Sequence, residues 1–470
     1  MVSMNESASG KRVWRVGTLS YTAGGLFLLG IYLLGGDFPW ALKDRAVSPS
    51  ATLLIKQIGV SELVYGLVII GFPNFTNLFL SPAVSYLSDR HRGRWGRRIP
   101  FLMFTTPFIV LGLYLLGFSR ILGSWLHGVL PAVSEHAGML LFFCIAWVML
   151  DFGTTLSGSL FGALVNDVVP QELIGRFFGL FRMVSLGAGI LYNGWLIERV
   201  RTHTSEIFLG IGTLYLLGLL LLCFKVKEGE YPPPPEEESS ASGKGGPVLV
   251  RVMRSAVTYL RQSFSMGYYR WYMSAIALGS ITFMPINFFS IQYAEKLGID
   301  MGMYGLYLVI TYVASLILSY PLGAIADRFH PVRCGIASMA AYLAVMIAGW
   351  GLLSDVRWFG VIFVLHGVIS GCFFTLTASM PSRLVPRELF AQFGSAAGLI
   401  LSFCSMVMGP LLGGALDLLA HDYRSLFPVG AFLHSGISES FPELHEMRRR
   451  RRLSAADAAM NRHGIPLRRE

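Results

Sequence analysis

About twelve apolar runs of roughly bilayer-spanning length, the last of them short and interrupted by polar residues, constrain the fold of this chain more than any other feature. A transmembrane helix needs about 20 predominantly apolar residues. Only 14% of the 470 residues are charged, whereas soluble domains carry charge at about a quarter of their positions. We therefore predict an all-α membrane protein with spans near residues 17–36, 60–86, 99–119, 137–165, 174–196, 205–224, 270–293, 301–325, 333–353, 357–380, 389–419 and 425–441.

A polar segment divides these spans into two sets of six. The stretch from Lys225 to Gly246 reads KVKEGEYPPPPEEESSASGKGG, and its prolines, acidic run and Ser/Gly tract are typical of a disordered linker. In the next stretch, PVLVRVMRSAVTYLRQSF, the apolar residues share one helical face, which predicts a helix lying in the membrane interface. We expect a six-helix bundle over 1–224, a linker with this interfacial helix over 225–268, a second six-helix bundle over 269–445 and a basic tail over 446–470.

Basic residues in the short loops predict how the chain crosses the membrane. Cytoplasmic loops collect Lys and Arg. The loop SDRHRGRWGRRIP (Ser88–Pro100) and the run RRRRR (Arg448–Arg452) fall on the same side as the N-terminus when every span inserts. This predicts a multi-pass protein of the plasma (inner) membrane with both termini in the cytoplasm, and it assigns Lys43 and Arg45 to an outside loop. The basic loops also explain the net charge of +10. Nucleic-acid binding is not needed to explain it, because the chain carries no nucleic-acid-binding motif.

The two halves of the chain repeat the same loop sequences. VVPQEL (Val168–Leu173) follows the fourth span, and LVPREL (Leu384–Leu389) follows the tenth. LSDRHRG follows the second span, and IADRFHP follows the eighth. Duplicated halves related by an axis along the membrane normal are typical of transporters that bind substrate near the midplane.

At these residues the chain resembles a known family. The loop SDRHRGRWGRRIP is similar to the loop between the second and third helices of the major facilitator superfamily. Its pattern D-R-x-R-x-R-W-G-R-R-x-P resembles the glycoside–pentoside–hexuronide:cation symporters and the plant sucrose–proton symporters. The resemblance implies two pseudo-symmetric six-helix bundles and a monomeric secondary transporter. It would move a small polar solute, a sugar or glycoside, by alternating access and together with protons.

The resemblance also implies that charged loop residues lock the cytoplasmic ends of the helices when the cavity opens outward. Surface ion pairs suit a gate that opens easily, because each is worth only about 0–1 kcal/mol. Asp89 would pair with a basic side chain or with the end of the eleventh helix, and the arginines with loop carboxylates such as Glu172. The expected gate comprises Asp89, Arg90, Arg94, Arg97, Arg98, Glu172, Arg176, Asp327, Arg328 and Glu388.

One departure from the family bears on the coupling ion. Sodium-coupled members carry two aspartates in the second helix, and a gapless count from the loop places these positions at Asn77 and Ser81. A hard cation usually requires a carboxylate, so the sodium site is not expected here. Asp151 instead lies near the middle of the fourth span. An acid there is costly and usually functional, so we predict that it takes up and releases a proton, with a permanent polar partner as the alternative.

Other polar residues inside the spans are candidates for the solute site. Arg182 lies about 12 Å inside the fifth helix, where it could approach Asp151 directly or through a solute, or reach the headgroups. Asn77 and Ser81 could bind sugar hydroxyls or join helices. Asn287 and Gln292 are pocket candidates in the seventh helix, and His366 is either a proton relay or a packing contact.

Two further functions stay open at this point. The first is a drug or metabolite exporter of the same fold, since 33 phenylalanines are compatible with an apolar cavity. The second is a non-transporting assembly factor, because the loop also resembles that of the bacterial proteins that deliver bacteriochlorophyll. No ATP-binding motif, nucleophile elbow or metal-ligand cluster occurs. We therefore expect no enzyme activity and no cofactor, with the solute, a proton and the lipid bilayer as partners.

Overall fold

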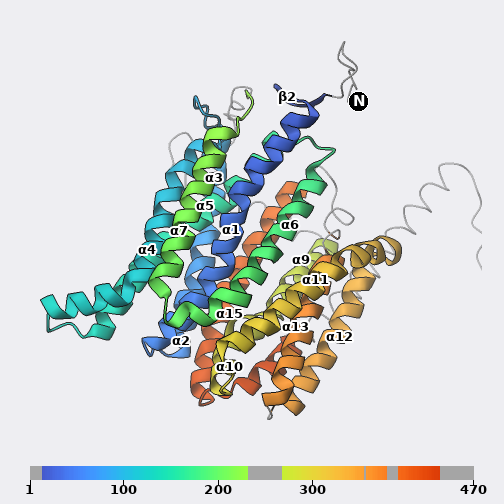
Figure 1. Cartoon of the computed structure of the whole chain (residues 1–470). Coiled ribbons are helices and arrows are strands. Elements are labelled where there is room, and N and C mark those ends of the chain that lie inside the picture. The colour runs from blue at the N-terminus through green and yellow to red at the C-terminus, as the bar shows by residue number, and fades with distance from the viewer. Residues whose placement is uncertain (1–12, 231–266, 354–355, 378–379, 381–389, 434–470) are drawn as a thin grey trace, which may run out of the picture. The chain divides into compact units, whose positions relative to one another are not determined.

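The computed structural model describes residues 13–230, 267–353, 356–377, 380 and 390–433, and it consists mostly of long helices (Figure 1). The helices up to residue 230 are α1 (Ala23–Gln57), α2 (Glu62–Tyr65), α3 (Phe72–Arg90), α4 (Ile99–Val129), α5 (Glu135–Val168), α6 (Ile174–Leu191) and α7 (Thr204–Lys225). Beyond residue 266 they are α9 (Gly267–Ile281), α10 (Met284–Lys296), α11 (Met301–Phe329), α12 (Pro331–Leu352), α13 (Val356–Thr377) and α15 (Phe390–Leu418). Shorter segments are the π helices η1 (Gly66–Gly71) and η2 (Tyr192–Leu196) and the 3-10 helices η3 (Ile197–Arg201) and η5 (Tyr423–Ser425).

Eleven helical stretches in these described ranges are long and apolar enough to cross a membrane. Many large apolar side chains point outward from them; Phe27 is 70% exposed and Trp195 is 68% exposed. Extensive exposed apolar surface is unfavourable in water and favourable in lipid. The expected twelfth span, 425–441, is described only as far as residue 433. The interfacial helix, the basic tail and most of the linker lie outside the described residues.

The chain enters its first helix later than predicted. A two-stranded antiparallel hairpin, β1 (Trp14–Val16) and β2 (Leu19–Tyr21), precedes α1. The side chain of Thr22 then accepts the backbone N–H of Gly25 at 3.2 Å, which caps the first turn of α1.

The same helix also ends much later than predicted. It runs for 35 residues to Gln57, a length of about 52 Å. The prediction of a first span over 17–36 was therefore wrong at both ends. The cause is a cluster of charged residues between Asp37 and Arg45, which reads as a loop although it lies inside the helix.

Backbone contacts divide the chain into two compact units. The first contains the described residues up to 230 together with Gly298–Val313 and Gly409–Leu418. The second contains the described residues of 267–297, 314–408 and 419–433. In the first unit α1 packs against α6 and α7, and α4 packs against α5 and α7 (Figure 1). In the second, α12 packs against α13.

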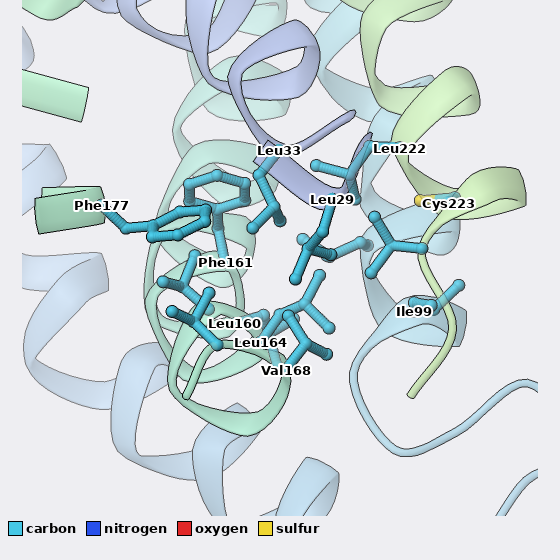
Figure 2. Packing of buried hydrophobic residues seen from close by; sticks show 14 of the residues in the cluster. Leu29, Leu33, Ile99, Leu160, Phe161, Leu164, Val168, Phe177, Leu222 and Cys223 are labelled. Atoms are coloured by element: carbon cyan, nitrogen blue, oxygen red, sulfur yellow. The ribbon is translucent and has the colours of Figure 1, made fainter. Parts of the chain in front are cut away.

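An apolar cluster holds the first unit together at the end where the chain leaves for the linker (Figure 2). Leu29 and Leu33 of α1 pack there against Leu164 and Val168 of α5 and Leu222 of α7. Burial of each such side chain contributes about 1.5–3 kcal/mol relative to exposure in water. The cluster therefore joins six helices, since α3, α4 and α6 also contribute side chains to it.

Aromatic rings form the corresponding core of the second unit. Phe283, at the break between α9 and α10, lies 4.6 Å from the ring of Tyr342 and 5.5 Å from that of Phe373, centre to centre. Edge-to-face pairs of this kind contribute about 0.5–1.5 kcal/mol beyond their burial.

At the end of the first unit opposite the hairpin, backbones meet directly. A Cβ added at Gly413 would overlap the carbonyl oxygen of Glu62, and one at Gly409 would overlap the side chain of Ile70 in η1. The carboxylate of Asp417 accepts the backbone N–H groups of Glu62 at 2.9 Å and Leu63 at 2.8 Å. It thereby caps the start of α2, where a negative charge is favourable.

Candidate functional site

Five charged residues lie inside α1: Asp37, Lys43, Asp44 and Arg45 near its middle, and Lys56 in its last turn. The assignment of Lys43 and Arg45 to an outside loop was therefore wrong. Lys43 is only 2% exposed, and Arg45 is half-buried. A charged side chain at the bilayer centre costs at least about 2.5–3.5 kcal/mol. The groups that compensate these charges mark the region where function is expected.

Lys43 reaches from α1 to α5. Its Nζ donates a hydrogen bond to Thr154 Oγ1 at 3.2 Å and lies 4.1 Å from the centre of the Trp40 ring. Thr154 follows Asp151 by three residues, so both side chains lie on the same side of α5. Lys43 is also close enough to Asp151 for their charges to interact. A hydroxyl, an aromatic face and two carboxylates thus surround the ammonium group, because Oδ1 of Asp44 also lies 3.9 Å from Lys43 Nζ.

Asp151 is also held by α3. Thr76 Oγ1 donates a hydrogen bond to Asp151 Oδ2. We call Lys43, Thr76, Asp151 and Thr154 the Lys43 cluster; it joins α1, α3 and α5 within the first unit. Sequence reasoning singled out Asp151 but missed the lysine and both threonines.

The Lys43 cluster can bind hydroxyl groups and respond to a proton. Lysine donates hydrogen bonds, the carboxylate accepts them, and threonine does both, which is the donor and acceptor set that sugar hydroxyls require. Interaction between charges is strong in a low dielectric. Protonation of Asp151 would therefore remove one of the two attractions on Lys43, while the ion pair with Asp44 remains.

Arg182 does not complete this cluster. Its side chain is exposed on α6, and the contacts of Asp151 within the described residues are to Thr76 and Lys43. The arginine that links α1 to α6 is Arg45, whose Nη2 donates to Ser185 Oγ at 3.0 Å.

Asn77 and Ser81 lie on the same helix as Thr76. Asn77 is exposed and Ser81 is half-buried. Successive helical residues point about 100° apart, so the hydroxyl of Thr76, and not the amide of Asn77, meets Asp151. A solute-binding role for Asn77 and Ser81 stays a prediction.

In the second unit, His366 sits in a hydrogen-bonded chain. Its Nδ1 pairs with Tyr342 Oη at 2.9 Å and its Nε2 with Asn287 Oδ1 at 3.0 Å, while the ring is only 1% exposed. The predicted residues Asn287 and His366 are thus in contact. Gln292 is buried. When its side-chain amide is oriented so that both the oxygen and the nitrogen have suitable partners, the nitrogen donates to the carbonyl oxygens of Phe288 and Phe289 on the same helix.

The arginine loop between α3 and α4 is held by two acids. Arg97 Nε donates to Asp167 Oδ2 at 2.9 Å, and Arg98 Nε donates to the same oxygen at 3.3 Å. The carboxylate of Glu228 accepts the backbone N–H groups of Arg97, Arg98 and Ile99 at 2.8–2.9 Å. Asp167 ends α5, and Glu228 follows α7. Sequence reasoning missed both, although each is an acid next to a helix end on the side of this loop.

The other expected gate residues are either exposed or lie outside the part of the structure that is described. Arg94, Glu172 and Arg176 are exposed. Arg328 is exposed, and its guanidinium carbon lies 5.4 Å from the ring centre of Phe329. The side chains of Asp89, Arg90 and Asp327, and the whole of Glu388, lie outside the described residues.

Membrane-length helices in two compact units, with interacting charges inside the spans, define a polytopic membrane protein of the transporter class. The sequence model of the Major Facilitator Superfamily matches residues 20–410, so the chain belongs to that superfamily. The predicted resemblance and the predicted fold class are thereby confirmed.

Several curated proteins are similar over part of the chain. Solute carrier family 45 member 3 of Mus musculus is 27% identical over 220 residues, which cover 46% of this chain and 37% of that protein. Proton-associated sugar transporter A of Mus musculus is 31% identical over 175 residues, covering 36% and 21%. Sucrose transport protein SUC4 of Arabidopsis thaliana is 24% identical over 181 residues, covering 37% and 34%. The matches span well under half the length of these relatives.

Solved structures share the fold at lower identity. A D-xylose-proton symporter has a TM-score of 0.62 and 14% identity, over 89% of this chain and 98% of that one. A POT family transporter in complex with 5-aminolevulinic acid has a TM-score of 0.65 and 14% identity, over 91% and 99%.

Proposed function

We propose that this chain is a secondary active transporter that moves a sugar or glycoside together with protons by alternating access. The similarity to proteins named as sugar and sucrose transporters supports the solute class. The basic loops support a location in the plasma (inner) membrane with both termini in the cytoplasm. The transporter works as a monomer in the bilayer.

The observation that carries this proposal is the Lys43 cluster. When Asp151 is ionised, it attracts Lys43 and accepts the Thr76 hydroxyl. Uptake of a proton by Asp151 weakens that attraction and frees Lys43 and Thr76 to donate to the solute. Loss of the proton on the other side of the membrane restores the attraction and expels the solute. Proton and solute movement are coupled because they use the same hydrogen-bonding groups.

The loop arginines form part of the cytoplasmic gate in this proposal. Arg97 and Arg98 share Asp167, which ties the α3–α4 loop to the end of α5. Asp89, Arg90, Arg94, Glu172 and Arg176 belong to the same gate. Asp327, Arg328 and Glu388 act in the repeated loops of the other half. Arg182, Asn77, Ser81, Asn287, Gln292 and His366 complete the candidate solute and proton pathway.

Proton uptake by vesicles that contain the purified protein tests the proposal. A panel of sugars and glycosides is added outside, and the external pH is followed for wild type and Asp151→Asn. We expect one sugar to cause external alkalinisation in wild type and none in the variant. Asp422→Asn is the matched control, because this exposed carboxylate caps Arg424 N–H at 3.2 Å and an amide oxygen can do the same.

Other outcomes point elsewhere. Absence of flux with every sugar, in protein shown to be folded, would refute the sugar assignment. Release of apolar compounds from loaded vesicles would then indicate an exporter, and copurified pigment would indicate an assembly factor. Sugar-dependent flux that persists in Asp151→Asn would contradict the role given to the Lys43 cluster.

A further inference from the structure

A second acid lies inside α1, away from the Lys43 cluster. Asp37 precedes Lys43 by six residues, which places it about 9 Å nearer the N-terminal end of the helix. Its side chain is buried, with only 7% of the residue exposed. Its Oδ2 atom is inaccessible and has no hydrogen-bond partner among the described residues.

The residues on either side of Asp37 in the sequence pack closely against α7. A Cβ on the neighbouring Gly36 would overlap Leu222 of α7, and one on Gly218 of α7 would overlap Pro39 and the carbonyl oxygen of Gly35. The backbones of α1 and α7 are thus nearly in contact at the level of Asp37.

Titratable and charged groups do occur on the helices around α1. On α1 itself, Lys43 is engaged with Thr154. Asp44 and Arg45 also lie on α1, and the helices packed against it carry Asp151 on α5, the exposed Arg182 on α6, and Tyr215 and Cys223 on α7. In the described part of the chain none of them forms a hydrogen bond or an ion pair with Asp37.

An ionised carboxylate in this position has no counterpart for its charge. Transfer of an isolated charge into an apolar interior costs so much that the group becomes neutral instead. An aspartate that stayed neutral through the whole transport cycle would be replaceable by a neutral residue without loss. An aspartate that meets water or a cation in another conformation would instead carry a proton between the two states.

We propose that Asp37 is a second proton-binding site, filled in this conformation and emptied in another. The proton comes from water on one side, forms an O–H bond with the carboxylate and is returned to water on the other side. This inference rests on the proposed proton coupling and adds to it. In the Lys43 cluster, Asp151 binds a proton whose uptake is linked to the solute contacts. Proton binding by Asp37 depends only on the conformation of the protein.

An infrared measurement on the protein in lipid vesicles tests the filled site without any solute. The carbonyl stretch of protonated carboxyl groups is recorded against pH, in light and heavy water, for wild type, Asp37→Asn and Asp422→Asn. We expect a carboxyl band in wild type and in Asp422→Asn that is missing from Asp37→Asn. Asp37→Glu keeps a carboxyl group and should therefore show the band at a shifted position. This variant distinguishes loss of the carboxyl group from misfolding of Asp37→Asn.

The proton-to-solute ratio in the vesicle flux assay tests whether the proton moves. We expect the ratio to fall about twofold in Asp37→Asn, because one of the two proposed proton-binding acids, Asp37 and Asp151, is lost. An unchanged carboxyl spectrum in Asp37→Asn would overturn the inference while leaving coupling through Asp151 intact. A lost band with an unchanged ratio would also overturn it, since Asp37 would then be a permanently neutral group. A titrating Asp37 band without any solute-driven flux would instead refute the proposed function.

Discussion

Replacement of Glu228 provides a direct test of how the arginine loop is held. Oε2 of Glu228 accepts the N–H of Arg97 at 2.9 Å, and Oε1 accepts those of Arg98 and Ile99, each at 2.8 Å. The N–H groups of Arg97 and Arg98 directly precede α4 and that of Ile99 is its first, so no carbonyl of the helix itself can accept them. Glu228→Ala leaves all three without this acceptor and removes a negative charge from the positive end of the helix dipole.

The expected loss follows from the cost of removing a helix cap. Loss of a capping side chain costs about 0.5–2 kcal/mol, and the upper end applies here because one carboxylate serves three donors. For a cooperative unit of roughly 150–250 residues, a loss of about 2 kcal/mol corresponds to a fall in Tm of about 4–8 °C. Glu228→Gln should lie between wild type and alanine, since the amide oxygen can still accept two of the bonds.

Thermal unfolding of the purified protein in detergent measures this effect. Reaction of its cysteines with a thiol-specific dye reports unfolding, because Cys223 is buried beside the loop. Glu230→Ala is the matched control: its side chain is exposed, and its described contact is through the backbone to Thr18. Equal Tm values for the Glu228 and Glu230 variants would refute the reasoning, since they would show that only net charge matters.

Two further substitutions test contacts elsewhere in the structure. Gly413→Ala should lower Tm well below that of Gly414→Ala, because the new methyl group overlaps the Glu62 carbonyl only at position 413; equal effects at both positions would contradict the close approach. Tyr342→Phe should cost about 1–3 kcal/mol, because it leaves a buried nitrogen of His366 unpaired, and an unchanged unfolding midpoint in chemical denaturant would show that the bond is not formed.

The transmembrane architecture could be predicted because it depends on long apolar runs. The second to eleventh spans were expected close to their observed places, although α4 runs ten residues beyond the predicted end at 119. The first was misjudged because Asp37, Lys43, Asp44 and Arg45 lower the local hydropathy, and the charges were taken as a loop. Ala23–Gln57 nevertheless keeps a mean hydropathy of 1.4 over its most apolar window, which was the available signal.

The candidate site was predicted only in part for a related reason. Asp151 stands out because a single acid in an apolar span is rare. Thr76 and Thr154 do not, since threonine is common in membrane helices and only the packing of α3 against α5 brings Thr76 to the acid. Likewise, the arginines of the loop were evident, but their partners Asp167 and Glu228 come from chain segments about 70 and 130 residues away.

The π-helical segments η1 and η2 change how these helices can vary during evolution. A π turn holds one more residue than an α turn, so every residue after it is rotated by about 100° relative to an uninterrupted helix. The direction in which Thr76 points from α3 is thus set independently of the orientation of α2, whose first N–H groups are capped by Asp417. An alignment with a relative that lacks the extra residue needs a one-residue gap inside the span. Selection can alter the polar lining of one half of such a helix while the packing of the other half stays the same.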